Sequence, residues 1–299
     1  MLTIFKSKNI SASGLAWFLL ILLSIIWGSS FILIKKALLA FSPSQVGAGR
    51  IVIAFLAFLP LFIRHYKKIN GRILWPLIVV GLCGSGFPAF LYAFAQTHIP
   101  SAVAGVLNSL TPIFTFVLGI FIFQQVFKWS QLSGVIVGFL GVLIISMAKG
   151  ADDTPFPFFY AGLILIGTIF YAISANTVKK YLGKVDPVLI STFSFIIIGP
   201  FVLLYLLNSS FIETVSTHPD GYKSLVSLLV LSLIGTFSAN ILFFKLVQLT
   251  DAVFSSSVSF LIPFVALFWG FIDGEYLGLY HFLALFLIIL GVVLIKLKR

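Results

Sequence analysis

Ten apolar segments, each close to the length that crosses a lipid bilayer, fill almost the whole 299-residue chain. A membrane-spanning helix needs roughly 20 mainly apolar residues. The composition, 60% hydrophobic and 9% charged, cannot cover a water-soluble fold with polar surface. The segments are continuously apolar rather than alternating, which excludes an outer-membrane barrel. The sequence therefore predicts an all-α integral membrane protein with ten transmembrane helices, at 15–39, 43–63, 73–95, 101–123, 130–148, 157–178, 187–208, 224–248, 252–273 and 278–295.

The last five segments repeat the first five. The matching positions lie at constant offsets: Trp27, Ser30, Lys35, Lys36 and Pro43 stand 144 residues before Tyr171, Ser174, Lys179, Lys180 and Pro187, and Pro112, Gly119 and Gln124 stand 151 residues before Pro263, Gly270 and Glu275. Because five is an odd number, two such units in one chain must lie upside down relative to each other. Inverted repeats are typical of secondary transporters, so the pattern predicts a carrier.

The predicted division has four parts. A cytoplasmic N-terminal tail covers 1–14, the first five-helix repeat 15–148, an external linker 149–156 and the second five-helix repeat 157–296. The connections between the segments are short, so no soluble domain is predicted.

The distribution of charge predicts the orientation. The net charge of +11 comes mostly from lysines and arginines in tails and loops. If both termini are cytoplasmic, fourteen of these residues are internal and four external, which agrees with the positive-inside rule. We therefore expect a multi-pass protein of the plasma (inner) membrane with both termini in the cytoplasm, and no nucleic-acid partner. The internal residues are Lys6, Lys8, Arg64, Lys67, Lys68, Arg72, Lys128, Lys179, Lys180, Lys184, Lys245, Lys296, Lys298 and Arg299, and the external ones are Lys35, Lys36, Lys149 and Lys223.

Three short stretches resemble motifs of a known transporter family. The run from Trp27 to Phe31, with Lys35, resembles the opening motif of EamA-type members of the drug/metabolite transporter superfamily. The stretches 107–112 and 259–263 are similar to the proline-bearing fourth and ninth helices of that family, and Glu275 matches the acidic residue that closes the ninth helix. Gln124 stands at the equivalent place in the first repeat and departs from the pattern. The resemblance implies two pseudo-symmetric halves around a central cavity that handles amino acids, other metabolites or drugs.

Two prolines mark the expected depth of that cavity. Pro112 frees the carbonyl of Asn108 and Pro263 frees that of Ser259, because a proline has no N–H to donate four residues back. Each proline lies about ten residues into its helix, or roughly 15 Å at 1.5 Å per residue, which is near the bilayer midplane. The freed carbonyls are candidate ligands for a substrate ammonium or hydroxyl group. The alternative is a kink whose backbone is satisfied by Ser and Thr side chains.

The remaining candidate binding residues are aromatic or polar and lie at equivalent positions in the two repeats or in neighbouring helices. Aromatic rings at such depth can stack on a substrate or attract a cation, although packing is an equally good explanation. These candidates are Trp27, Ser30, Tyr92, Tyr171, Ser174 and Asn240.

Charged residues inside the spans are few. Arg50 is the clearest; it could bind a substrate carboxylate, but snorkelling to the outer headgroups is the favoured interpretation. Lys245 presents the same choice near an inner helix end, where Asp251 is a candidate partner and a structural role is favoured. All eight carboxylates fall in loops or at helix ends, so the sequence predicts either a facilitator or coupling through Glu275.

The predicted function is a secondary transporter that moves amino acids or similar small amphipathic metabolites, outward if it follows the family tendency, by alternating access. The alternatives are a proton-coupled exporter of drugs or other metabolites and an intramembrane enzyme. The sequence offers no catalytic constellation, metal-ligand cluster or nucleotide-binding loop for the latter, so no enzyme, cofactor or metal is expected. The partners expected are a small-molecule substrate and the lipid bilayer. The chain is predicted to be a monomer, with a dimer as the alternative.

Overall fold

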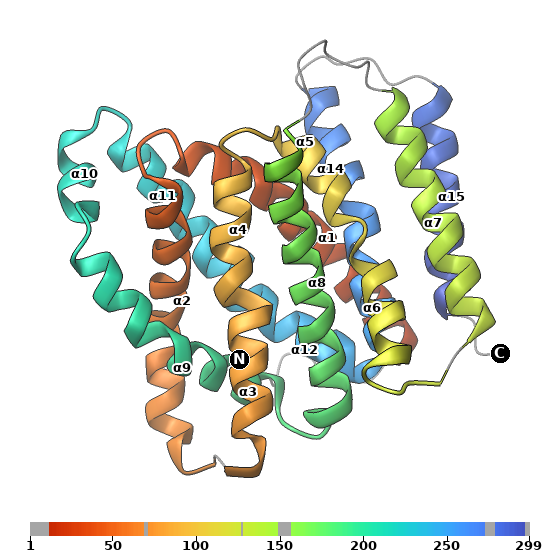
Figure 1. Ribbon diagram of the computed structural model, residues 1–299, viewed down its shortest axis with the longest axis horizontal. Helices are drawn as coiled ribbons and strands as arrows, with labels where there is room; N and C mark the ends of the chain where they lie inside the picture. The colour runs from red at the N-terminus through yellow and green to blue at the C-terminus, as the bar shows by residue number, and fades with distance from the viewer. Residues whose placement is uncertain (1–11, 69–70, 127, 149–156, 273–278, 297–299) are drawn as a thin grey trace.

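The computed structural model describes residues 12–68, 71–126, 128–148, 157–272 and 279–296, and within these ranges the regular structure is entirely helical (Figure 1). The α-helices are α1 (Ala12–Ala37), α2 (Pro43–His65), α3 (Leu74–Gly81), α4 (Phe87–Ala95), α5 (Ser101–Asn108), α6 (Thr111–Phe121), α7 (Trp129–Ala148), α8 (Phe158–Tyr181), α9 (Pro187–Leu207), α10 (Phe211–Thr217), α11 (Gly221–Ser232), α12 (Ala239–Leu249), α13 (Ala252–Ser256), α14 (Val258–Ile272) and α15 (Leu279–Lys296). Short 3₁₀ turns are η2 (Tyr66–Lys68) and η3 (Gly71–Ile73), and π-helical turns are η4 (Leu82–Gly86) and η5 (Leu233–Ser238).

The length and composition of these helices confirm a multi-pass membrane protein. Seven helical segments of the described chain are long and apolar enough to cross a bilayer: Ala12–Ala37, Pro43–His65, Gly71–Ala95, Val103–Phe121, Phe158–Tyr181, Pro187–Leu207 and Gly221–Leu249. Shorter apolar helices cover Trp129–Ile144, Ala252–Val265 and Leu283–Lys296. The all-helical prediction is therefore confirmed, while the number of ten crossings stays a prediction.

Side-chain caps fix where several helices begin. Ser42 forms a capping box with Gln45 at the start of α2, where Pro43 occupies the first turn. Asp186 caps α9 in the same way relative to Pro187, and its carboxylate accepts from the amide of Val188 at 2.8 Å. A negative group at a helix N-terminus also interacts favourably with the helix dipole. A Ser–Pro or Asp–Pro pair thus marks the residue at which the helix begins in both places.

Two of the predicted spans are interrupted rather than continuous. Segment 101–123 divides into α5 and α6, and segment 252–273 divides into α13 and α14. Each interruption lies a few residues before a proline, Pro112 or Pro263, which cannot donate to the carbonyl four residues earlier. The prediction of two unbroken helices is corrected at these points, where backbone groups leave the regular α-helical pattern.

Two further interruptions are π-helical turns that the apolar pattern did not predict. η4 joins α3 to α4, and η5 joins α11 to α12. They begin at Leu82 and Leu233, which are separated by the same 151 residues as the two prolines. Gly84 and Gly235 lie in these turns, and a Cβ on them would approach the hydroxyls of Ser174 and Ser30 to 2.5 and 2.9 Å. The glycines therefore permit close contact with α8 and α1.

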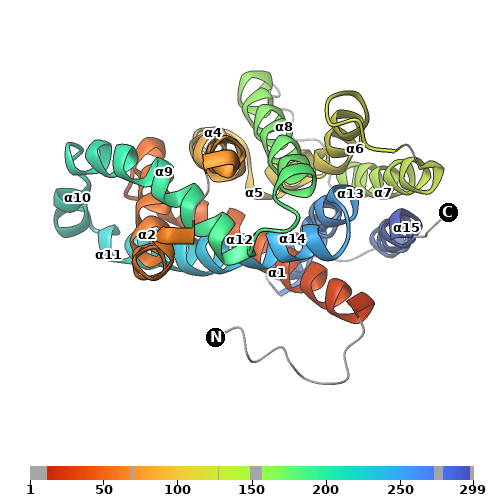
Figure 2. The same ribbon diagram turned by 90° about the horizontal axis from the view of Figure 1, so that it is seen from below.

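The helices form an elongated arrangement with different partners at its two ends (Figure 1). α7 and α15 lie side by side along one edge, whereas α10 and α11 lie at the opposite end beside α2 and α9; Figure 2 shows the same pairs from below. α1, α8, α12 and α14 occupy the middle. α10 was not expected, because the segment between 208 and 221 was predicted as a loop.

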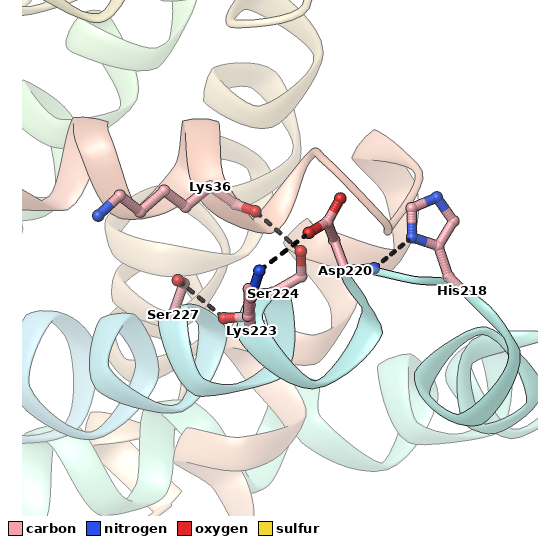
Figure 3. Close-up of polar contacts among 6 residues, drawn as sticks. All are labelled: Lys36, His218, Asp220, Lys223, Ser224 and Ser227. Atoms are coloured by element: carbon pink, nitrogen blue, oxygen red, sulfur yellow. Dashed lines mark hydrogen bonds and ion pairs between the residues drawn. The ribbon is translucent and has the colours of Figure 1, made fainter.

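Polar contacts tie the end of α1 to the start of α11 (Figure 3). The Ser224 hydroxyl donates to the carbonyl of Lys36 at 2.9 Å, and Lys223 lies 3.8 Å from the carboxylate of Asp220. The backbone N–H of Asp220 donates to Nδ1 of His218 at 3.1 Å. The Ser224–Lys36 bond attaches the start of α11 to α1, and the other two contacts lie within the α10–α11 connection and the first turn of α11. They involve no residue of the cavity described below.

The α7–α15 contact supplies a stability test. Gly291 lies so close to α7 that a Cβ would come within 2.5 Å of the Gly138 backbone nitrogen and 2.6 Å of the Gly134 carbonyl oxygen. We expect Gly291→Ala to lower the free energy of unfolding by about 1–3 kcal/mol, the usual cost of overpacking. Thermal unfolding in detergent measures the effect. Gly162→Ala is the matched control, since nothing lies within 4 Å of its added methyl group; equal melting temperatures for the two variants would contradict the packing described.

Candidate functional site

A cavity of about 830 Å³, counted with its open mouth, lies where the central helices meet. Helices from both halves of the chain build its wall: α1, α2, η4, α4, α5, α6, α8, α12, α13 and α14. The lining residues are Trp27, Ser30, Phe31, Ile34, Arg50, Gly84, Tyr92, Asn108, Thr111, Tyr171, Ser174, Ala175, Asn240, Phe243, Phe244, Ser256, Val258, Ser259 and Ile262.

The structure brings most of the predicted site residues into this one cavity. Those that line it are Trp27, Ser30, Arg50, Tyr92, Asn108, Tyr171, Ser174, Asn240 and Ser259. Pro112 and Pro263 are buried but do not line the cavity. Pro112 lies in the first turn of α6, just after the break that follows Asn108, and Pro263 lies inside α14, four residues after Ser259. That these residues bind a substrate stays a prediction.

Lys245 is not among the residues that line the cavity. Lys245 is exposed on α12, and the carboxylate of Asp251 accepts from the amide of Phe254 as the cap of α13. Lys245 and Asp251, both within the described ranges, form no ion pair, so that partnership is not found. Glu275 lies outside the described residues.

The carbonyls freed by the prolines are already bonded to hydroxyl groups. The Thr111 hydroxyl donates to the carbonyl of Asn108 at 2.6 Å. The hydroxyl of Ser109 donates to the carbonyl of Ser259 at 3.1 Å, which links α5 to α14. Ser and Thr side chains thus satisfy the backbone at both breaks, which agrees with the alternative that the sequence left open. A carbonyl oxygen can accept a second hydrogen bond, so a role of these groups in binding a substrate stays a prediction.

Aromatic rings form two equivalent pairs across the cavity. Trp27 packs against Phe243 with ring centroids 5.1 Å apart, and Tyr171 packs against Tyr92 at 5.8 Å. Tyr171 follows Trp27 by 144 residues, and Phe243 follows Tyr92 by 151 residues. These are the two offsets found in the sequence. Phe243 was missed as a candidate, although its position 151 residues after Tyr92 is a signal that would have found it. Offset, tilted rings at these separations interact favourably.

Hydrogen bonds fix the orientation of two rings. The indole N–H of Trp27 donates to the carbonyl of Gly235 in η5 at 3.0 Å, so the π-helical turn supplies the acceptor. The hydroxyl of the buried Tyr92 donates to the side-chain oxygen of Asn108. Asn240 donates from its amide to the carbonyl of Thr236, also in η5, at 2.8 Å. The polar residues of the wall are thus oriented by the helix interruptions around them.

Arg50 lies in the cavity wall. Its Nε donates to the hydroxyl of Thr236 at 2.6 Å, and the guanidinium is within hydrogen-bonding reach of Tyr171. Thr236 is held in turn by its own bond to the carbonyl of Leu231 at 3.2 Å. The favoured interpretation of Arg50 as a snorkelling residue did not predict these contacts within the protein. Their source is a buried threonine in a π-helical turn, which no apolar pattern predicts.

The electrostatic character of the cavity follows from its lining. Arg50 is the charged residue among the lining side chains, which otherwise are aromatic, aliphatic or neutral polar. Within the part of the chain that the structure describes, no three His, Cys, Asp or Glu residues gather in a way that could hold a metal ion. The arrangement can bind a small molecule with an apolar body, and it contains no visible nucleophile–base pair.

The model of the EamA-like transporter family matches the chain over residues 14–147 and again over 158–297. The chain belongs to the EamA-like transporter family. The resemblance drawn from the sequence motifs is thereby confirmed.

Relatives of this EamA-like protein are named as transporters rather than enzymes. An uncharacterized transporter of Archaeoglobus fulgidus is 26% identical over 284 residues, which cover 95% of this chain and 99% of the relative. An S-adenosylmethionine/S-adenosylhomocysteine transporter of Chlamydia muridarum is 23% identical, over 91% of this chain and 88% of the relative. A solved crystal structure shares the fold with a TM-score of 0.70 and 15% identity, over 93% of this chain and 95% of the other.

The bond between Tyr92 and Asn108 can be tested by a double-mutant cycle. We expect Tyr92→Phe to destabilise the protein by about 1–3 kcal/mol, because the buried amide oxygen of Asn108 loses its donor. Adding Tyr92→Phe to Asn108→Ala is expected to cost less than adding it to the native protein. Thermal unfolding in detergent measures all four proteins, with Tyr205→Phe on the exposed side of α9 as the control. Strict additivity of the two changes would contradict a direct bond.

Proposed function

We propose that this protein is a secondary transporter that carries amino acids or similar small amphipathic metabolites outward across the plasma (inner) membrane by alternating access. The observation that carries the proposal is the cavity itself. Aromatic rings and neutral polar groups surround it, and residues from both family-matched stretches line it. A site at the meeting of two repeats is the usual place for a substrate in such carriers.

Several features support ten crossings arranged as two inverted five-helix repeats. The family model matches two stretches, 14–147 and 158–297, close to the proposed repeats 15–148 and 157–296. Pro112 and Pro263, and the first residues of the two π-helical turns, are each separated by 151 residues. In this proposal 1–14 is a cytoplasmic tail, 149–156 an external linker, and both termini are cytoplasmic because the lysines and arginines then follow the positive-inside rule. The working unit is a monomer.

The helix interruptions support alternating access. A helix bends most easily where its hydrogen-bond ladder is broken by a proline or a π-helical turn. η4 and η5 contact α8 and α1 through Gly84 and Gly235, whose neighbours are Ser174 and Ser30. Movement of one half against the other can therefore pivot at these turns without opening the rest of the packing. The same turns hold residues that bond to the cavity wall, so such movement would change the site.

The cavity lining favours a facilitator over a proton-coupled carrier. The described residues that line it include no carboxylate or histidine, whereas proton-driven carriers commonly keep a titratable group deep in the membrane. Coupling through Glu275 remains the alternative, with drugs or other metabolites as cargo. A second candidate cargo is an adenosyl compound, because a relative at 23% identity is named as an S-adenosylmethionine/S-adenosylhomocysteine transporter.

Flux in proteoliposomes tests the proposal. We expect saturable, stereoselective uptake of at least one labelled amino acid, unchanged by an imposed pH gradient. S-adenosylmethionine belongs in the same panel. Flux that appears only with the gradient would remove the facilitator and direct attention to Glu275, and Glu275→Gln would then abolish it. Release of a chemically altered product would indicate an enzyme instead.

A further inference from the structure

Among the described residues, the cation in the cavity wall has no opposite charge beside it. Arg50 is partly buried and lines the cavity together with neutral side chains, and the described lining contains no aspartate or glutamate. A cation without a partner is costly in a membrane interior, and the cost falls when an anion binds next to it. The unpaired charge of Arg50 therefore indicates that the cavity accepts a ligand with an anionic group.

The guanidinium is held in one orientation. Its Nε donates to Thr236 at 2.6 Å, and Thr236 is anchored to Leu231 in the adjoining helix. Tyr171 lies at the same guanidinium. A planar, oriented guanidinium pairs with a carboxylate through two parallel hydrogen bonds, which a flexible surface arginine does only at an entropic cost.

A second polar residue lies in the same wall but is covered. Ser174 is 2% exposed, and its buried hydroxyl has no hydrogen-bond partner within the described residues. The hydroxyl packs against η4, because a Cβ on Gly84 would come within 2.5 Å of it. Arg50 is therefore the charged donor that the described cavity wall offers to a ligand.

The rest of the lining describes the body of the ligand. Trp27, Tyr92, Tyr171 and Phe243 provide two tilted ring pairs, and no acidic side chain among the lining residues is present to neutralise an ammonium group. Rings of this kind stack on apolar or aromatic groups. A substrate amine is therefore tolerated rather than required.

We infer that the cavity recognises its substrate through a carboxylate, which Arg50 binds, and that it accepts monocarboxylates with an apolar or aromatic body whether or not they carry an α-ammonium group. This inference rests on the proposed transport function, because it names the chemical group by which that same site selects its cargo.

Binding to the purified full-length protein in nanodiscs tests the inference without requiring flux. The probes are four sets matched to leucine, phenylalanine, tryptophan and methionine, each with the amino acid, its amide and the acid that lacks the amine. In at least one set, we expect the amino acid to bind about tenfold or more tightly than its amide. The reason is that the amide loses the hydrogen-bonded charge pair between the carboxylate and Arg50. The acid without the amine is expected to bind comparably to the amino acid. If no acid in the panel exceeds its amide by tenfold, whether because both bind or because neither does, the inference is overturned.

Variants assign the preference to Arg50. Arg50→Gln is expected to reduce the affinity for the acid to that for the amide, whereas Arg64→Gln, at the exposed inner end of the same helix, leaves both unchanged. Arg50→Lys keeps the charge but loses the planar geometry, so an intermediate loss is expected, and it replaces Arg50→Gln if that variant does not purify as a folded protein. A full acid preference in Arg50→Gln or, where it is used, Arg50→Lys would overturn the assignment.

The binding and flux experiments test the carboxylate site and the proposed transport independently. Acid-selective binding without flux would remove the proposed transport and keep the carboxylate site. Flux with equal rates for acids and amides would keep transport and remove the carboxylate site.

Discussion

The need to satisfy every backbone hydrogen bond in a bilayer is the constraint on which this structure depends. In the hydrocarbon region an unpaired N–H or C=O is costly, so regular helices dominate. The interruptions that do occur lie around the cavity, where side chains take over the freed groups. Thr111 and Ser109 bond to the carbonyls of Asn108 and Ser259, and Trp27 bonds to that of Gly235. Irregular backbone is thus concentrated where protein and cavity, rather than lipid, surround it.

These compensating bonds also position the candidate site. Trp27 is oriented because a π-helical turn presents the carbonyl of Gly235, and Arg50 is oriented because the same turn presents the hydroxyl of Thr236. Gly235 and Thr236, which bond to Trp27 and Arg50 of the cavity wall, are therefore neighbours in the same π-helical turn. A change in the turn would disturb both the stability of the helix and the shape of the site. The break in the helix and the binding surface are two consequences of one local geometry.

Hydropathy and repetition predicted much of this arrangement from the sequence. Long apolar runs identified the helical membrane class, and residues at matching offsets, such as Trp27 with Tyr171, pointed to a shared cavity. What the pattern missed depends on hydrogen-bond register. Gly84 and Gly235 stand in apolar runs that look like ordinary helix, and nothing in the composition shows that the backbone there is π-helical. The position of Arg50 followed the same rule, because its partner Thr236 faces it only as a result of that turn.

The duplication gives the cavity similar geometry on its two sides but different chemistry. The aromatic pairs Trp27–Phe243 and Tyr92–Tyr171 occupy equivalent positions and have similar ring separations, 5.1 and 5.8 Å. Arg50 has Ser194 at the equivalent place, 144 residues later, and the hydroxyl of Ser194 donates to the carbonyl of Leu77 at 3.3 Å instead of facing the cavity.

The fixed charge is therefore on one side only of an otherwise matched space. A symmetric cavity would hold a substrate equally well in two opposite orientations. A single guanidinium removes that degeneracy, because only one orientation places a carboxylate beside it. If the proposed carboxylate recognition holds, the shape of the site follows from the matched aromatic pairs, and the orientation of the substrate follows from the one position at which the halves differ in charge.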